Sequence, residues 1–209
     1  MAVQLIWGDA DARNLEGYFT LSLYPVGILL PVLGILTVTT EWSQRTALAT
    51  FSLVPERHRI VIAKVAAATI FAMLSLLTSL LLSVIGNGLG ILLVENDGSW
   101  SLPAANILQA LLFQVLGVVM GVGFGMLLMN TPLAIVLYFM LPTVWQILTG
   151  LITAIQDAAE WLNLNGTMEP LSSGTLSGDG WGKLATSALV WIVLPLAVGT
   201  VRLLRREVK

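Results

Sequence analysis

The charged residues that could take part in chemistry are concentrated in one short segment, residues 41–64. Glu41 opens this segment, and its bases are Arg45, Arg57, Arg59 and Lys64. Glu41 and Arg45 have the i, i+4 spacing at which two side chains pair on one face of a helix. The other bases can bind lipid phosphates or an acidic rim on a partner protein. We therefore expect a charged contact surface here.

Neither catalysis nor a bound cofactor is indicated by the rest of the chain. It has no cysteine, and its single histidine, His58, lies among the arginines, where a solvated side chain is expected. The nearest approach to a Walker A motif is Gly182-Lys183, but Leu184 follows where Ser or Thr is needed. We expect no enzyme activity, no metal site and no cofactor in this chain itself.

The elements that position these residues are apolar helices. The chain has 209 residues, of which 56% are hydrophobic and 11% charged, whereas soluble domains carry about 25% charged residues. Its apolar runs reach the roughly 20 residues that a helix needs to cross a bilayer. We predict an all-α membrane protein, a single transmembrane domain over residues 1–209, with about five spans at residues 18–40, 65–85, 104–129, 131–155 and 184–203.

Local signals refine these boundaries. Pro25 and Pro31 predict that the first span is kinked or partly opened. Gly86-Asn87-Gly88 predicts a turn that ends the second span, and Asn130-Thr131 predicts a tight turn between the third and fourth.

Charge asymmetry predicts the orientation. Bases gather on one side of the predicted membrane: Arg45, Arg57, Arg59, Lys64, Arg202, Arg205, Arg206 and Lys209. The other side receives only Arg13 and Lys183. The positive-inside rule makes the first set cytoplasmic, with the N-terminus outside and the C-terminus inside. Residues 41–64 then form a cytoplasmic loop and residues 156–183 an outer loop, in which residues 158–164 fit a short dipping helix and a plain loop about equally.

Apart from Arg202 at the end of the last span, the predicted spans contain no Asp, Glu, Lys, Arg or His, and their most polar members include Gln109, Gln114 and Gln146. A proton- or ion-coupled carrier normally keeps ionisable groups at membrane depth. The composition therefore argues against such a carrier. If the chain moves a solute uphill, the energy must arrive from another subunit. The net charge of −2 argues against nucleic acid as a partner.

Residues 43–54 show how that energy could arrive. Ala47, Leu48, Phe51 and Val54 form an apolar stripe at helical spacing. A short helix of this kind can seat in a groove of an ATPase subunit and transmit its closure. From charge alone, the more common alternative is an ordinary basic cytoplasmic loop.

The order of residues in the segment resembles type-2 ABC exporter permeases. The resemblance rests on an acidic-aromatic pair, a threonine, a proline followed by arginines, and a lysine that opens the next span: Glu41, Trp42, Thr46, Pro55, Arg57, Arg59 and Lys64. Arg45 stands where the family usually has glycine. Residues 125–131 resemble the family's turn between its fourth and fifth spans, and residues 181–208 resemble its last span and basic tail. The family usually has six spans, and its first has no counterpart among the five predicted here, which fits either a longer natural chain or a protein that works with five spans.

The resemblance implies a permease in a bacterial inner (plasma) membrane that pairs with a second copy or a similar permease. It implies coupling to separate ABC ATPase subunits, which hold ATP and magnesium, through Glu41, Trp42, Arg45, Thr46, Leu48, Phe51, Pro55, Arg57, Arg59 and Lys64. The alternative is a non-transporting assembly, sensor or immunity-type subunit of the same fold.

A glycine stripe marks the third span. Gly117, Gly121 and Gly125 recur at every fourth residue, a pattern that lets a second helix approach closely. We expect this stripe to pack against another helix of the same chain; a contact between subunits is the alternative.

Overall fold

A computed structural model of the protein describes residues 13–44, 57–94, 98–151 and 159–205. This described part is helical and contains no strand. Five helices are long and apolar enough to cross a membrane. They are α2 (Leu15–Ser43), α4 (Arg57–Val94), α5 (Ala104–Leu128), α6 (Thr131–Leu151) and a last helix made of α9 (Gly180–Ala188), η3 (Leu189–Val193) and α10 (Leu194–Arg205). The prediction of an all-α polytopic membrane bundle is confirmed.

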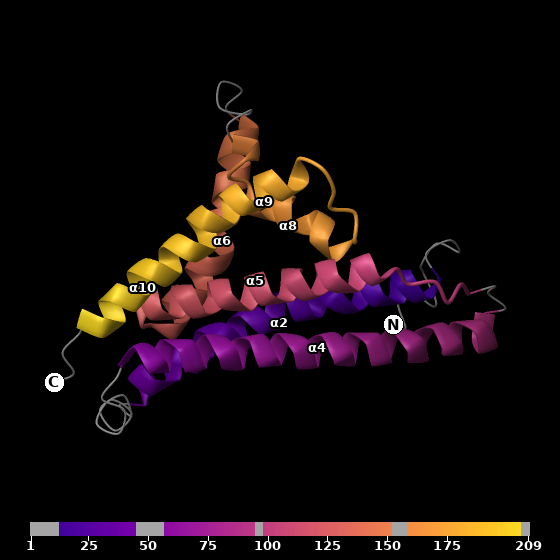
Figure 1. Ribbon diagram of the computed structural model, residues 1–209, viewed down its shortest axis with the longest axis horizontal. Coiled ribbons are helices and arrows are strands. Elements are labelled where there is room, and N and C mark those ends of the chain that lie inside the picture. Colours follow the sequence, from indigo (N-terminus) through magenta and orange to yellow (C-terminus); the bar gives the residue numbers. More distant parts are fainter. Residues whose placement is uncertain (1–12, 45–56, 95–97, 152–158, 206–209) are drawn as a thin grey trace.

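Helix α5 is the centre of the bundle (Figure 1). On one face it shares a buried cluster with α2, α4 and α10, which includes Val38, Ala72 and Val118. On another face it packs against α8 (Leu164–Ser172) and the last helix through Phe124, Leu171 and Ile192. Helix α5 therefore joins the two halves of the molecule.

The closest helix contact joins α2 and α5. A Cβ added at Gly121 would lie 2.3 Å from the backbone oxygen of Pro31, and one added at Gly34 would lie 2.5 Å from the backbone oxygen of Val118. Gly125 and Gly117 continue the same contact, against Ile35 and Pro31. The stripe of Gly117, Gly121 and Gly125 thus packs inside this chain, against α2. Because both helices supply a glycine, their backbones meet where any larger side chain would separate them.

The segment Gly86-Asn87-Gly88 does not form the predicted turn. Helix α4 continues through it to Val94, and it reaches 38 residues, a length of about 57 Å at 1.5 Å per residue. The residues that follow Gly88 are again apolar, and a glycine costs only about 1 kcal/mol in a helix, so the glycines do not end it. The side chain of Asn87 is buried and donates to the backbone oxygen of Ser99. Helix α2 likewise remains helical through Pro25 and Pro31.

The turn between α5 and α6 is as short as predicted. Met129 ends α5 with a left-handed φ of 51°, and its N–H donates to the backbone oxygen of Gly125. Asn130 then caps α6, because its Oδ1 accepts from the N–H of Leu133 at 3.0 Å. Thr131 Oγ1 donates to Thr39 Oγ1 at 2.7 Å, which ties the start of α6 to α2.

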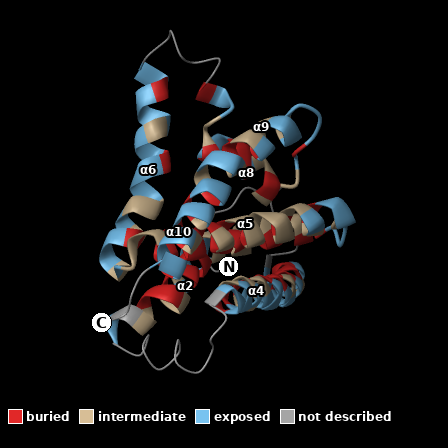
Figure 2. Cartoon of the chain, turned by 60° about the vertical axis from the view of Figure 1, so that its left-hand side comes forward, coloured by how far each residue is buried: buried red, intermediate tan, exposed pale blue. Residues whose placement is uncertain are grey.

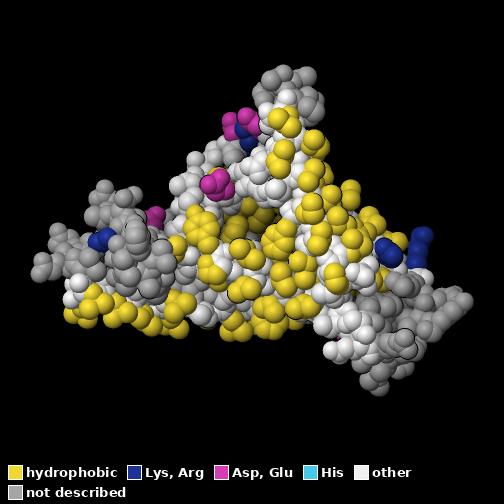
Figure 3. All heavy atoms as spheres, turned by 180° about the vertical axis from the view of Figure 1, so that it is seen from behind, with side chains coloured by type: hydrophobic (Ala, Val, Ile, Leu, Met, Phe, Trp, Pro, Cys, Tyr) yellow, Lys and Arg dark blue, Asp and Glu magenta, His cyan; other side chains and the backbone are white. Residues whose placement is uncertain are grey.

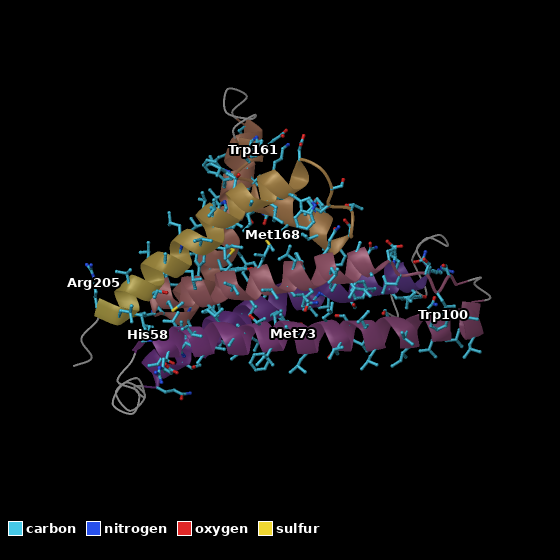
Figure 4. The ribbon with its side chains drawn as sticks, in the orientation of Figure 1. His58, Met73, Trp100, Trp161, Met168 and Arg205 are labelled. Atoms are coloured by element: carbon cyan, nitrogen blue, oxygen red, sulfur yellow. The ribbon has the colours of Figure 1, made fainter. Side chains whose placement is uncertain are left out.

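Several helix ends meet at what we call the basic end, defined by Arg59, Lys64, Arg202 and Arg205. Lys64 contacts the end of α2, and Arg202 donates to the backbone oxygen of Leu127 at the end of α5. His58 and Arg205 lie at this end and Trp100 at the opposite one (Figure 4). The described bases named here thus lie at one end of the bundle, and the side of the membrane that this end faces stays a prediction.

From the basic end, α6 diverges from α2, α4 and α5, and its far half stands apart from them (Figures 1 and 2). Only 22% of the residues in an apolar 18-residue stretch of α6 are buried. Large apolar side chains on α4 and α6, such as Leu81, Leu92 and Ile147, are more than half exposed, and Figure 3 shows hydrophobic side chains covering much of one face. Exposed apolar surface of this extent is suited to lipid and not to water.

If the α2–α5 contact carries the fold, Gly121→Ala should lower the free energy of unfolding by about 1–3 kcal/mol, because the added methyl group must displace the Pro31 carbonyl. Gly88→Ala in α4 is the matched control, since nothing lies within 4 Å of its Cβ position. Thermal unfolding of the purified chain in detergent measures both. Equal midpoints for Gly121→Ala and the parent would contradict the importance of this contact.

Candidate functional site

Two of the predicted coupling residues form an ion pair at the basic end. Lys64 Nζ lies 2.8 Å from Glu41 Oε1 and also donates to the backbone oxygen of Thr37. The two side chains are 9% and 25% exposed, respectively. Glu41 comes from the last turns of α2, one helical turn beyond Thr37, and Lys64 comes from the start of α4. The pair therefore fastens together the two helices from which residues 45–56 leave and to which they return.

A shallow depression lies beside this pair. Its lining includes Arg59, Ile60, Ala63 and Ala67 of α4, together with Thr37 of α2. Arg59 is exposed, so a guanidinium group stands at its rim. The described part of segment 41–64 thus presents a basic surface around a buried ion pair.

This geometry corrects one expectation. Lys64 was expected to meet lipid phosphates or an acidic partner, but its ammonium group is buried and engaged by Glu41 and Thr37. Arg45, Thr46, Leu48, Phe51 and Pro55 lie outside the described residues, as do the side chains of Trp42 and Arg57. The predicted pair of Glu41 with Arg45 and the predicted helix over residues 43–54 therefore stay predictions.

A second feature is a cavity of about 430 Å³ between α2, α5, α6 and α8. Figure 3 shows the molecule hollowed here, with hydrophobic side chains around the opening. Phe113, Met120 and Tyr138 are among the large apolar residues that line this cavity. Met73 on α4 lies elsewhere and is about half exposed. Met168 of α8 also lines the cavity and belongs to the same buried cluster as Met120 of α5.

Polar contacts join α8 to α9 and hold the connection between them against the start of α5. Gln109 makes two hydrogen bonds to the backbone of Leu176, at 3.1 and 3.0 Å. Thr167 and Ser187 share a buried hydrogen bond of 2.7 Å between α8 and α9. Residues 156–183 are thus more than the predicted loop, because they contain α8 and the beginning of α9, and the face of α8 that carries Leu171 is buried.

One ion pair lies in this region. Lys183 Nζ contacts Glu160 Oε2 at 2.5 Å. The hydrogen bond from Lys183, and then its charge, lower the pKa of the Glu160 carboxyl. The small stabilisation from this pair is therefore present at neutral pH and is lost as pH falls through that lowered pKa. Because the pair is exposed, it contributes little to stability.

Comparison of the chain with protein-family models, with curated proteins and with solved structures gave no match in any of the three. Function must therefore be argued from the residues and the geometry.

Sequence reasoning did not identify the partner of Glu41 or the role of Gln114. Lys64 and Glu41 lie 23 residues apart in the sequence, and only the antiparallel packing of α2 and α4 brings them together. The signal in the sequence was a glutamate at the end of one apolar run and a single lysine at the start of the next. Gln114 was the most central polar residue of its span, and that position was the only indication of a buried role.

The ion pair predicts an asymmetry between two substitutions. Glu41→Gln leaves the buried ammonium of Lys64 without its counter-ion and should cost about 1–3 kcal/mol, below the 3–5 kcal/mol of a fully buried pair. Lys64→Met should cost less, since the remaining carboxylate is a quarter exposed and can be hydrated. Unfolding midpoints in detergent test the order. A larger loss for Lys64→Met would show that the pair does not hold α2 to α4.

Proposed function

We propose that this chain is the membrane-spanning permease subunit of an ATP-driven exporter of the type-2 ABC kind, in a bacterial inner membrane. Separate ATPase subunits, which hold ATP and magnesium, would bind at residues 41–64. A second copy or a similar permease would complete the transmembrane unit.

The observation that carries the proposal is the anchoring of residues 41–64. The Glu41–Lys64 pair fastens α2 to α4 where this segment leaves and re-enters the membrane. A protein that pushes on the segment therefore pushes on both helices together. Helix α2 also lines the cavity, through residues such as Leu23, Leu30 and Pro31. A mechanical route thus leads from the basic end to the cavity along one helix.

The membrane-spanning helices also favour an external energy source. The interiors of the five helices carry no ionisable acid or base: residues 17–40, 65–94, 104–128, 131–151 and 184–201 contain no Asp, Glu, Lys, Arg or His. A group that binds and releases a coupling proton or sodium ion is normally such a residue. The composition of these helices is therefore suited to mechanical input from an ATPase.

The direct test is assembly with the ATPase. Phe51 is the largest apolar residue of the predicted coupling helix, and loss of a buried aromatic anchor typically weakens an interface by at least about 2 kcal/mol, or roughly 30-fold in affinity. Phe51→Ala should therefore reduce co-purification of an ATP-hydrolysing subunit with the tagged chain from native membranes. Expression and membrane insertion should stay near those of the parent.

The matched control neutralises bases at the same end, in Arg205→Gln together with Arg206→Gln, and should retain the ATPase. If Phe51→Ala keeps the ATPase while the tail variant loses it, residues 41–64 are only a basic connector. An ATPase that binds without any accompanying export would favour the non-transporting subunit.

A further inference from the structure

The cavity between α2, α5, α6 and α8 changes in character along its length. On α2 it runs from Thr20 to Pro31, a distance of roughly 16 Å. Its deep part is apolar and is formed by residues such as Leu30, Pro31 and Met120. The part near α8 is polar: Asn165 donates to Gln146 at 3.1 Å across the rim. A cavity with one apolar and one polar end is shaped for an amphiphile.

One buried polar atom beside the apolar part lacks a partner. Gln114 lines the cavity and is only 2% exposed. Its Oε1 lies within hydrogen-bond distance of Ser75 Oγ on α4, a hydroxyl that can also donate to the backbone oxygen of Ala72. Its Nε2 has no hydrogen-bond partner among the described residues. A buried amide donor left unpaired is costly, and a turn of the Gln114 side chain toward the cavity would let a hydrogen-bond acceptor on a bound molecule satisfy it.

The charge in the lining of the cavity is negative. Glu169 of α8 is the single Asp, Glu, Lys, Arg or His among the described residues that line it, and it lies in the polar part near Asn165 and Ser172. Its carboxylate is exposed. An anionic head group placed there would be repelled, whereas a cationic one would be attracted.

We propose that this cavity binds a cationic amphiphile with a single apolar chain and an ester or amide carbonyl. The chain lies along α2 between Leu30 and Met120, the carbonyl oxygen accepts from Nε2 of Gln114, and the cationic head lies beside Glu169. That the permease would export this class of molecule rests on the proposed function. That the cavity binds it rests on the geometry alone.

The test uses three probes that share length and differ in one group each. Lauroylcholine has the ester carbonyl and a cationic head. Pentadecyltrimethylammonium keeps the length and charge but lacks the ester. Lauroyl isethionate keeps the ester but carries a sulfonate. Each is titrated by calorimetry, below its micellar concentration, into the purified chain in lipid nanodiscs, with empty nanodiscs as the reference. Lauroylcholine should bind more tightly than lauroyl isethionate, and the ratio of its affinity to that of the alkyl probe is the reference for the variants.

Substitutions then assign each preference to a residue. Gln114→Leu should reduce the preference for lauroylcholine over the alkyl probe by about fivefold, the effect of one hydrogen bond. Because that result is a ratio of two affinities in one protein, a general loss of folding would not imitate it. Glu169→Gln should reduce the preference for lauroylcholine over lauroyl isethionate and leave the ester preference unchanged.

Filling the cavity gives the last control. Thr143 on α6 lines the cavity, whereas the neighbouring Val144 does not and is 41% exposed. Thr143→Trp should abolish saturable binding of lauroylcholine, and Val144→Trp should not. Equal binding of the three probes by the parent, unchanged ratios in Gln114→Leu, or full binding by Thr143→Trp would overturn the inference. Because no ATPase is present, these results are independent of the co-purification test. Probe binding without an ATPase partner would overturn only the proposed function.

Discussion

The close approach of α2 and α5 is the contact on which the rest of the structure depends. In lipid, helices gain little from hiding apolar side chains from each other, so association relies on close packing of backbone and side chains. Gly34 and Gly121 each admit a carbonyl of the opposite helix to a position that a Cβ could not share. A second contact of the same type joins α5 to the last helix, where Gly199 meets Leu127 and Gly123. With α5 held on both sides, α6 is free to diverge, and its divergence leaves the cavity between α2, α5, α6 and α8.

This arrangement makes α2 the element shared by both candidate sites. Its end supplies Glu41 to the ion pair with Lys64, and its middle supplies the apolar wall of the cavity. Under the proposed function, movement of residues 41–64 by an ATPase would be carried along α2, because the ion pair fixes its end and the glycine contact fixes its middle. Gln114 adds a link to α4 through Ser75. The wall of the cavity is therefore connected to each helix that the coupling segment joins.

The sequence alone predicted the five membrane-spanning helices well, because an uninterrupted apolar run of sufficient length has few other stable conformations. The turn at Asn130 was also predictable, since α5 ends two residues earlier and Asn130 caps α6 directly. Gly86-Asn87-Gly88 was misleading as a turn signal, because the apolar run resumes at Leu89 and a glycine costs only about 1 kcal/mol in a helix. The pairing of Glu41 with Lys64 and the packing of α8 on α5 depend on how helices far apart in the sequence lie together, which no local pattern records. The unpaired amide of Gln114 depends on the same packing.

The central claim is that another subunit's ATP hydrolysis, and not an ion gradient, drives this chain. The most direct measurement reconstitutes the chain with its ATPase in liposomes and follows movement of lauroylcholine while a protonophore and a sodium ionophore collapse both gradients. The account predicts that transport continues when ATP and magnesium are supplied and stops without ATP. It also predicts that transport stops with an ATPase whose Walker A lysine has been replaced. Transport by the chain alone under an imposed proton or sodium gradient, without ATP, would contradict the account.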